Sequence, residues 1–283
     1  DRENDNFVRS PFDTTGEHGT LPETKYLAYD SSGILWIASW TALQKFDLHT
    51  HTFTKINLGS DGIPPWSMSL DKLGNVWISS IYNGQFVRVD KNDLTHRTYT
   101  FESHFKGKLN EWFTKIDQPS GIFADEENTI WAYVYNGGIY KFDWLNNRFQ
   151  NVLDSSDRHA FNTVIKDSAG RMWAGTYTKG VRLLDAGSKH WDSLVNSSNP
   201  KSIGGMTVLC SYVDRLGNVW LGTERGVSKM GRWAKPFVHY SHSPENLKNL
   251  SVGEVLAIRE DAEENLWFAR HIPNLVDKLD RSA

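Results

Sequence analysis

The sequence predicts an all-β protein of the β-propeller class, with six blades of four strands each. Three observations predict this fold: an Asp-to-Trp spacing of six residues recurs six times, strand-like segments flank every copy, and no copy holds ten residues of helical period. Repeats of about 20–50 residues indicate a solenoid, a propeller or an array. Because each copy carries only strand signals, a propeller is favoured over the helical arrays.

The repeated Asp and Trp residues mark the turn between two strands. Successive copies lie 41 to 54 residues apart and are Asp30/Trp36, Asp71/Trp77, Asp125/Trp131, Asp167/Trp173, Asp214/Trp220 and Asp261/Trp267. Asp can accept backbone hydrogen bonds from the residues just after it, and Trp offers a large apolar plate for packing on the neighbouring blade. We therefore interpret all twelve residues as scaffold and not as site residues.

The third position after each Asp needs a positive φ angle, which glycine adopts without strain. Four copies have glycine there (Gly33, Gly74, Gly170 and Gly217) and the third has Asn128. The sixth copy has Glu264, followed by Asn265. We therefore expect the sixth turn to be one residue out of phase.

Two further strands are expected in each copy. The third strand ends in an apolar residue and Asp, as in Phe46-Asp47, Val89-Asp90, Phe142-Asp143, Leu184-Asp185 and Leu279-Asp280. The fourth, outer strand is expected to begin at an aromatic residue: Phe53, Tyr99, Phe149, Trp191 or Phe237. Four strands in each repeat are what a propeller blade requires.

The repeats cover nearly the whole chain, so we expect one domain over residues 1–283. The expected blades span about 24–58, 66–102, 120–153, 161–194, 206–241 and 254–281 plus 6–12. The last repeat lacks a fourth strand, whereas residues 6–12 resemble the outer strand that starts near Phe237. We infer that the N-terminal strand completes the last blade and closes the ring, since closure removes an unpaired edge. A fragment of a longer array, or a seven-bladed relative, is the alternative.

Composition excludes several classes of function. The net charge of −3 with mixed signs argues against nucleic-acid binding, and no apolar run approaches the length of a membrane span. The single Cys210 rules out an internal disulfide, and its strand context favours a buried, inert thiol. Phosphate-loop, dinucleotide, metal-ligand and Gly-x-Ser-x-Gly patterns are absent, so no cofactor and no metal are expected.

Candidate ligand-binding residues lie on loops at one end of the blades. These loops join the second strand to the third, or join one blade to the next. The candidates are Trp40, Trp66, Tyr82, Tyr135, Tyr177, Arg225, Arg270 and His271. Aromatic faces stack on sugar rings or other apolar ligands, and Arg pairs with carboxylate or sulfate. The set suits an oligosaccharide, including an acidic one, although each aromatic could instead pack locally between blades.

Two other features leave different functions open. His271 and Glu224 could form an acid/base pair if their loops lie side by side, although such residues are more often ordinary surface. The insertion at residues 103–119, which contains Trp112, could be a docking edge for a protein partner.

The repeat resembles the regulator-propeller repeat of bacterial two-component sensors, as in Asp214-Arg-Leu-Gly-Asn-Val-Trp-Leu-Gly-Thr223 and the linker after Phe237. The resemblance covers residues 7–281. It implies the extracytoplasmic sensor of a hybrid histidine kinase that detects oligosaccharides, and hence a periplasmic or extracellular location. Low cysteine content alone leaves the cytoplasm open. Those sensors usually carry two seven-bladed propellers and an immunoglobulin-like domain, and this chain departs from that pattern.

The stretch from Leu266 to His271 more distantly resembles the repeats of streptogramin lyases, which use a His and Glu set at the propeller end. We expect a ligand-binding sensory propeller rather than an enzyme. The partners would be an oligosaccharide or other small ligand, and a second copy or other sensor domains. A lyase or hydrolase using His271 and Glu224, and a protein-interaction scaffold, are the alternatives.

Overall fold

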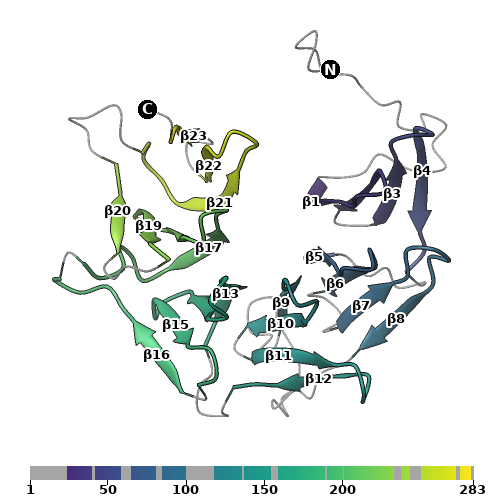
Figure 1. The fold of residues 1–283 in the computed structure, drawn as a ribbon, viewed down its shortest axis with the longest axis horizontal. Coiled ribbons are helices and arrows are strands. Elements are labelled where there is room, and N and C mark those ends of the chain that lie inside the picture. Colours follow the sequence, from purple (N-terminus) through teal and green to yellow (C-terminus); the bar gives the residue numbers. More distant parts are fainter. Residues whose placement is uncertain are drawn as a thin grey trace, which may run out of the picture. The chain divides into compact units, whose positions relative to one another are not determined.

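Antiparallel strands of three to seven residues make up the regular structure of the protein. The computed structural model describes residues 24–39, 42–58, 65–80, 85–99, 118–135, 137–153, 159–188, 190–199, 201–232, 237–242, 250–271 and 275–281. Within these residues there are six sheets, and in each one the strands pair in sequence order (Figure 1). No helix in these ranges is long and apolar enough to cross a membrane.

The first three sheets each have four strands. Blade one consists of β1 (Thr24–Tyr29), β2 (Ile34–Ser39), β3 (Leu43–Asp47) and β4 (Thr52–Ile56). Blade two consists of β5 (Ser67–Leu70), β6 (Val76–Ser80), β7 (Gln85–Val89) and β8 (His96–Tyr99). Blade three consists of β9 (Gln118–Ala124), β10 (Ile130–Tyr135), β11 (Gly138–Asp143) and β12 (Arg148–Asn151).

The last of the other three sheets is one strand shorter. Blade four consists of β13 (Phe161–Lys166), β14 (Met172–Thr176), β15 (Val181–Leu184) and β16 (Trp191–Leu194). Blade five consists of β17 (Val208–Val213), β18 (Val219–Thr223), β19 (Gly226–Met230) and β20 (Val238–Tyr240). Blade six has three strands among the described residues, β21 (Val255–Glu260), β22 (Leu266–Arg270) and β23 (Val276–Leu279). The prediction of an all-β, six-bladed propeller is confirmed.

The chain forms two compact units that both take part in blade three. Unit 1 comprises the described residues within 1–102, 122–132 and 142–150, and unit 2 those within 103–121, 133–141 and 151–283. Blades one and two therefore belong to unit 1, and blades four to six to unit 2. The assignment of residues 1–283 to one domain stays a prediction, and residues 6–12 lie outside the described ranges.

In five of the six blades, the Asp and the Trp that lie six residues apart are joined by a direct hydrogen bond. The indole Nε1 of the Trp donates to the Asp Oδ2 at 2.7 to 3.1 Å in blades two to six. The other carboxylate oxygen accepts the backbone N–H of the residue four positions on, in every blade. In blade one the Nε1 of Trp36 is buried and has no partner. One carboxylate thus fixes both the turn and the Trp rotamer.

The sixth turn is in phase with the others, so the expectation of a one-residue shift is wrong. Glu264 itself adopts a φ of 66°, close to the 63° of Asn128 in the third turn. Its backbone N–H donates to the carbonyl of Asp261 at 3.2 Å, as the glycines do in the other turns. Asn265 instead donates its side-chain amide to the Asp261 carboxylate. The side-chain bonds to Asp261 hold the turn in a conformation that Glu alone disfavours.

Four of the six repeated Trp rings are buried as predicted, whereas Trp131 is half-buried and Trp267 is 39% exposed. Trp36, Trp77, Trp173 and Trp220 have no exposed surface. Trp173 joins a cluster with Val208, Val219 and Leu221 of blade five, and Trp220 packs on Phe268 of blade six. Each such ring buries roughly 150–250 Å² of surface, so these rings dominate the blade-to-blade core.

The aromatic residues of the outer strands do not all open those strands. Only Trp191 is the first residue of its strand, whereas Tyr99 is the last residue of β8. Three of the aromatics pair with an aromatic or apolar residue on the third strand: Phe53 with Phe46, Tyr99 with Phe86, and Trp191 with Leu184. The cross-strand partner, and not the strand boundary, is what these three have in common.

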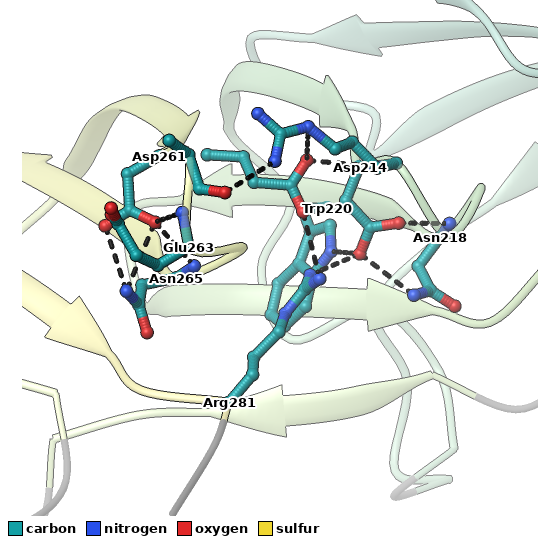
Figure 2. Close-up of polar contacts among 10 residues, drawn as sticks. Asp214, Asn218, Trp220, Asp261, Glu263, Asn265 and Arg281 are labelled. Carbon is teal, nitrogen blue, oxygen red and sulfur yellow. Dashed lines mark hydrogen bonds and ion pairs between the residues drawn. The ribbon is translucent and has the colours of Figure 1, made fainter.

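An arginine near the end of the described chain ties blade six to blade five (Figure 2). The Arg281 guanidinium contacts the buried carboxylates of Asp214 and Glu260, the latter at 3.1 Å, and lies 5.5 Å from the Trp220 ring. Burial raises the pKa of Asp214, but hydrogen bonds from Trp220, Asn218 and Arg281 outweigh it and keep that pKa below its usual value. The motif carboxylate of blade five is thus shared between two blades.

Two Trp residues of unit 1 allow the contribution of the Asp–Trp hydrogen bond to the free energy of unfolding to be measured. Trp77→Phe removes an N–H that donates to Asp71, whereas Trp36→Phe removes an N–H without a partner; both rings are fully buried. We expect Trp77→Phe to lower the free energy of unfolding by about 1.5–3 kcal/mol more than Trp36→Phe does. Urea titrations followed by circular dichroism measure the difference. Equal losses would show that the rings alone stabilise the blades.

Replacing Arg281 tests the ion pairs that join blades five and six. Arg281→Met leaves the carboxylates of Asp214 and Glu260, whose side chains have no exposed surface, without their shared cation. Breaking a buried ion pair by removing one partner costs about 3–5 kcal/mol. Arg281→Lys, which keeps the charge but not the forked geometry, is the control and should cost less. If the two variants unfold at the same urea concentration, the charge at this position is unimportant.

Candidate functional site

The turns that follow the second strands of unit 2 are joined to the segments leading into the blades by one chain of hydrogen bonds. Tyr135 pairs with Ala160 in an isolated antiparallel bridge, and the Ala160 carbonyl accepts the N–H of Tyr177 at 2.9 Å. The Tyr177 carbonyl accepts the Thr207 hydroxyl at 2.7 Å, and the Thr207 carbonyl accepts the N–H of Glu224. These hydrogen bonds therefore connect neighbouring blades three, four and five at one end of their strands.

Blade six repeats the same arrangement at its own edge. The N–H of His271 donates to the Glu254 carbonyl at 3.1 Å, the position that Tyr177 and Ala160 occupy in blade four. We call these residues the rim; they are Tyr135, Ala160, Tyr177, Thr207, Glu224, Glu254 and His271. The rim therefore contains three of the predicted ligand-binding residues, Tyr135, Tyr177 and His271.

A repeated irregularity of the first strands shapes the rim. In blades four, five and six, the pairing of first and second strands shifts register next to Phe161, Val208 and Val255. Such bulges bend a strand and re-aim side chains, and they are frequent next to functional sites. In blade four the shift frees Asn162, whose amide donates to the Val208 carbonyl of blade five at 3.0 Å. The bulge thereby links two neighbouring first strands.

Two glycines allow those first strands to approach closely. A Cβ on Gly175 would lie 2.6 Å from a methyl of Val208, and one on Gly222 would lie 2.7 Å from the Val255 carbonyl. Both glycines occupy the same place in the repeat, two residues after the motif Trp. They therefore keep successive blades of unit 2 close enough for the rim hydrogen bonds.

The aromatic side chains of the rim differ in exposure. Tyr177 is 51% exposed, directly after β14, while Tyr135 is half-buried at the end of β10. Their backbones are both held by Ala160, so two aromatic residues from neighbouring blades lie against one segment. An exposed tyrosine on a fixed backbone offers an apolar face and a polar hydroxyl to a ligand.

Glu224 supports the backbone of the rim. Its two carboxylate oxygens accept the N–H groups of Met206 and Thr207 at 3.1 and 3.0 Å. Gly205 is required for this contact, because a Cβ there would lie 2.4 Å from the Glu224 carboxylate. The pairing of Glu224 with His271, which the sequence left open as an alternative, is not formed among the described residues. The carboxylate that lies beside His271 is Glu254, with Oε2 3.5 Å from Nδ1.

Arg270 lies inside blade six and not on the rim surface. Its side chain is 1% exposed, and its Nε donates to Asp277 on β23 at 2.7 Å. The guanidinium also donates to the carbonyl of Gly253. Alternation along β22 places this side chain on the buried face, which the sequence position at a strand end did not reveal. The geometry gives Arg270 a role in holding the strands of blade six together.

The remaining predicted residues lie elsewhere. Trp66 precedes β5 in unit 1, where it is half-buried and its N–H donates to the Ser79 carbonyl at 2.8 Å. Trp40 and Tyr82 lie outside the described residues, as do Trp112 and most of the insertion. Arg225, with 70% of its side chain exposed, lines a cleft of blade five.

The blade-five cleft has a volume of about 310 Å³. Its walls are the described part of the connection from blade four, residues 196–199 and 201–204, the turn between β18 and β19, and the outer strand β20. Sequence analysis placed Arg225 among the loop candidates but missed the cleft. The Asn and Ser content of the connection was the available signal, but only the tertiary structure lays this connection against β20.

The described residues show no group of three or more His, Cys, Asp or Glu side chains that could hold a metal ion. Cys210 donates its thiol to the Val255 carbonyl at 3.3 Å, and burial raises its pKa to about 12. A thiol with so high a pKa is protonated at neutral pH and is a poor nucleophile. Cys210 is half-buried and not fully buried as expected, and its inertness stays a prediction.

Comparisons with known proteins identify the fold. No family model and no curated protein matches the chain. Among solved structures, the extracellular domain of the hybrid two component system BT3049 from B. thetaiotaomicron matches with a TM-score of 0.69 and 18% identity, over 92% of this chain and 34% of that one. The extracellular domain of BT4673 from the same organism matches with a TM-score of 0.67 and 15% identity, over 92% and 32%.

A virginiamycin B lyase from Staphylococcus aureus, crystallised as an inactive variant with quinupristin, matches with a TM-score of 0.69 and 12% identity, over 94% of this chain and 82% of the lyase. The likeness is one of fold. The chain spans about a third of the length of the two-component system structures. The predicted resemblance to sensor propellers and, beyond them, to streptogramin lyases is thus found in the solved structures.

Proposed function

We propose that this chain is the ligand-binding sensor domain of a two-component system and that its rim binds an oligosaccharide outside the cytoplasm. The observation that carries the proposal is the pair Tyr135 and Tyr177, which come from neighbouring blades and are held by the same residue, Ala160. Two tyrosines on fixed backbone can pack against successive sugar rings and donate hydroxyl hydrogen bonds.

Two further observations support a binding role. The fold is that of the extracellular domains of two-component systems, which supports a location outside the cytoplasm. The Glu224 carboxylate is engaged by backbone N–H groups, which favours a fixed binding surface over an acid/base pair with His271. In the proposed complex the exposed His271 adds a contact from the rim of blade six.

We also propose that residues 6–12 are the fourth strand of blade six. Among the described strands, β23 is hydrogen-bonded to β22 alone, and its Val276 is 62% exposed. Residues 6–12 contain Phe7-Val8, the same pair as Phe237-Val238 at the outer strand of blade five. An added strand would satisfy the unpaired backbone edge and cover the exposed apolar side chains.

The glycan-binding proposal is tested by a thermal-shift screen against neutral and acidic oligosaccharides. A ligand at about 100 times its dissociation constant stabilises a protein by about 2.7 kcal/mol, which raises Tm by several degrees in a chain of this size. We expect a selective shift that Tyr177→Ala abolishes. Tyr29→Ala, which removes a 60% exposed tyrosine next to the turn at Asp30, is the control and should retain the shift.

Two outcomes contradict the proposal. One is the absence of any stabilisation across the panel, and the other is a shift that Tyr177→Ala leaves intact. Mass spectrometry of the same mixtures tests the alternative of a lyase or hydrolase. Cleaved sugars that disappear with His271→Ala would show an enzyme, which the side-by-side His271 and Glu254 side chains could serve.

The closure proposal is tested by truncation. Deleting residues 1–12 should lower the free energy of unfolding by about 3 kcal/mol or more, because the side chains of Phe7 and Val8 would lose their buried places. Deleting residues 1–5 alone removes a polar segment and is the control. If both truncated chains melt at the temperature of the full chain, residues 6–12 do not complete the blade.

A further inference from the structure

Hydrogen bonds within the connection from blade four hold one wall of the blade-five cleft in a defined conformation. In the connection from blade four, the Asn196 amide donates to the Ile203 carbonyl at 2.7 Å, and the Ser202 hydroxyl donates to the Asn199 carbonyl at 2.7 Å. The Ser202 hydroxyl also accepts the Ser197 N–H at 3.0 Å. Side chains that bind their own backbone in this way hold a loop in one conformation, so little ordering is needed when a ligand arrives.

The opposite wall presents Arg225 from a tight turn. The Thr223 hydroxyl donates to the Gly226 carbonyl at 3.0 Å and accepts the Arg225 N–H at 3.1 Å. Gly226 has a φ of 120°, and a Cβ there would lie 2.4 Å from the Tyr240 carbonyl, so the turn lies directly against β20. The backbone of Arg225 is therefore fixed while its guanidinium stays exposed.

The carboxylate nearest to Arg225 does not satisfy the guanidinium. Glu224 Oε1 lies 3.9 Å from Arg225 Nε, which is beyond hydrogen-bond distance. Both oxygens of Glu224 already accept backbone N–H groups of Met206 and Thr207. Among the described residues no hydrogen bond occupies the guanidinium, so its donors can bind a group in the cleft, and Glu224 lowers the local positive charge without forming a hydrogen bond to it.

His239 supplies a second donor from β20. The buried Ser228 hydroxyl accepts the Gly204 N–H at 3.0 Å and lies 3.1 Å from His239 Nδ1. A buried hydroxyl needs an acceptor for its own hydrogen, and Nδ1 is the acceptor in reach. With Nδ1 accepting, the neutral imidazole carries its hydrogen on Nε2, which is then a donor.

The chemistry of the lining selects the ligand. The residues that line the cleft include Arg225, His239 and several Asn and Ser side chains, and none of them is Asp or Glu. Two nitrogen donors without an opposing carboxylate favour an anionic group, and a forked guanidinium matches a carboxylate. Amide and hydroxyl groups suit a ligand rich in hydroxyls. A volume of about 310 Å³ is at the small end for ligand sites, so it favours a single ring.

We propose that the blade-five cleft binds a sugar acid, with its carboxylate held by Arg225 and His239 and its hydroxyls by the Asn and Ser side chains of residues 196–202. The sugar acid can be a free monosaccharide or the end of an acidic oligosaccharide. The choice of a sugar as the ligand rests on the proposed function, which is the sensing of sugars. The residues that carry it are separate from the tyrosines of the rim.

The test titrates the full chain with D-glucuronate by saturation-transfer NMR at constant ionic strength, with D-glucose as the neutral probe. We expect saturable binding of D-glucuronate and none of D-glucose. Arg225→Gln should weaken binding at least about tenfold, because a charge-assisted bond is lost. His239→Phe should weaken it also. Lys201→Gln, on the same connection but outside the lining, removes the same charge and should leave binding unchanged.

A second arm separates the two sources of the sugar acid and the two proposals. An acidic disaccharide that ends in glucuronate is titrated into the wild type, Arg225→Gln and Tyr177→Ala. Loss of disaccharide binding with Arg225→Gln but not with Tyr177→Ala assigns the cleft to a terminal residue and supports the inference. If D-glucuronate does not bind and disaccharide binding depends on Tyr177 alone, the proposal for the cleft is wrong and the proposal for the rim stands. Absence of binding by both sugars overturns both, and circular dichroism of each variant excludes misfolding as the cause.

Discussion

A single carboxylate in each repeat carries the structure of this protein. The motif Asp accepts the backbone N–H of the residue four positions on with one oxygen and, in blades two to six, the indole N–H of the motif Trp with the other. The turn and the Trp rotamer are therefore fixed together. Because that Trp is the plate on which the next blade packs, the local bond also sets the contact between blades.

The rim follows from this arrangement. Once the blades are close, glycines such as Gly175 and Gly222 let neighbouring first strands approach, and hydrogen bonds join Tyr135, Ala160 and Tyr177 across blades. The rim is thus held by the same short-range packing that holds the fold. A ligand at the rim would contact several blades at once, which is a means by which binding could stabilise their arrangement.

The exposure of a residue could be predicted from the sequence where its place in the repeat determines its surroundings. Tyr177 lies exposed on the rim because it follows a second strand, and Cys210 is half-buried because it lies within a first strand. Arg270 follows the same rule of position yet is buried, because Asp277 on the adjacent strand provides a partner inside the blade. Partners of this kind come from another strand, and the repeat does not reveal them.

The sequence by itself determined the order of the strands, five of the six turns and the number of blades, because each depends on contacts within six residues or on a regular alternation. It also indicated the core position of four of the six motif Trp rings, whereas Trp267 is 39% exposed. Only the tertiary structure decided that Glu254 lies beside His271, that Glu224 holds two backbone N–H groups, and that residues 196–199 and 201–204 lie against β20 to make a cleft. These contacts join segments of irregular backbone, whose mutual positions depend on the packing of whole blades and not on any local preference.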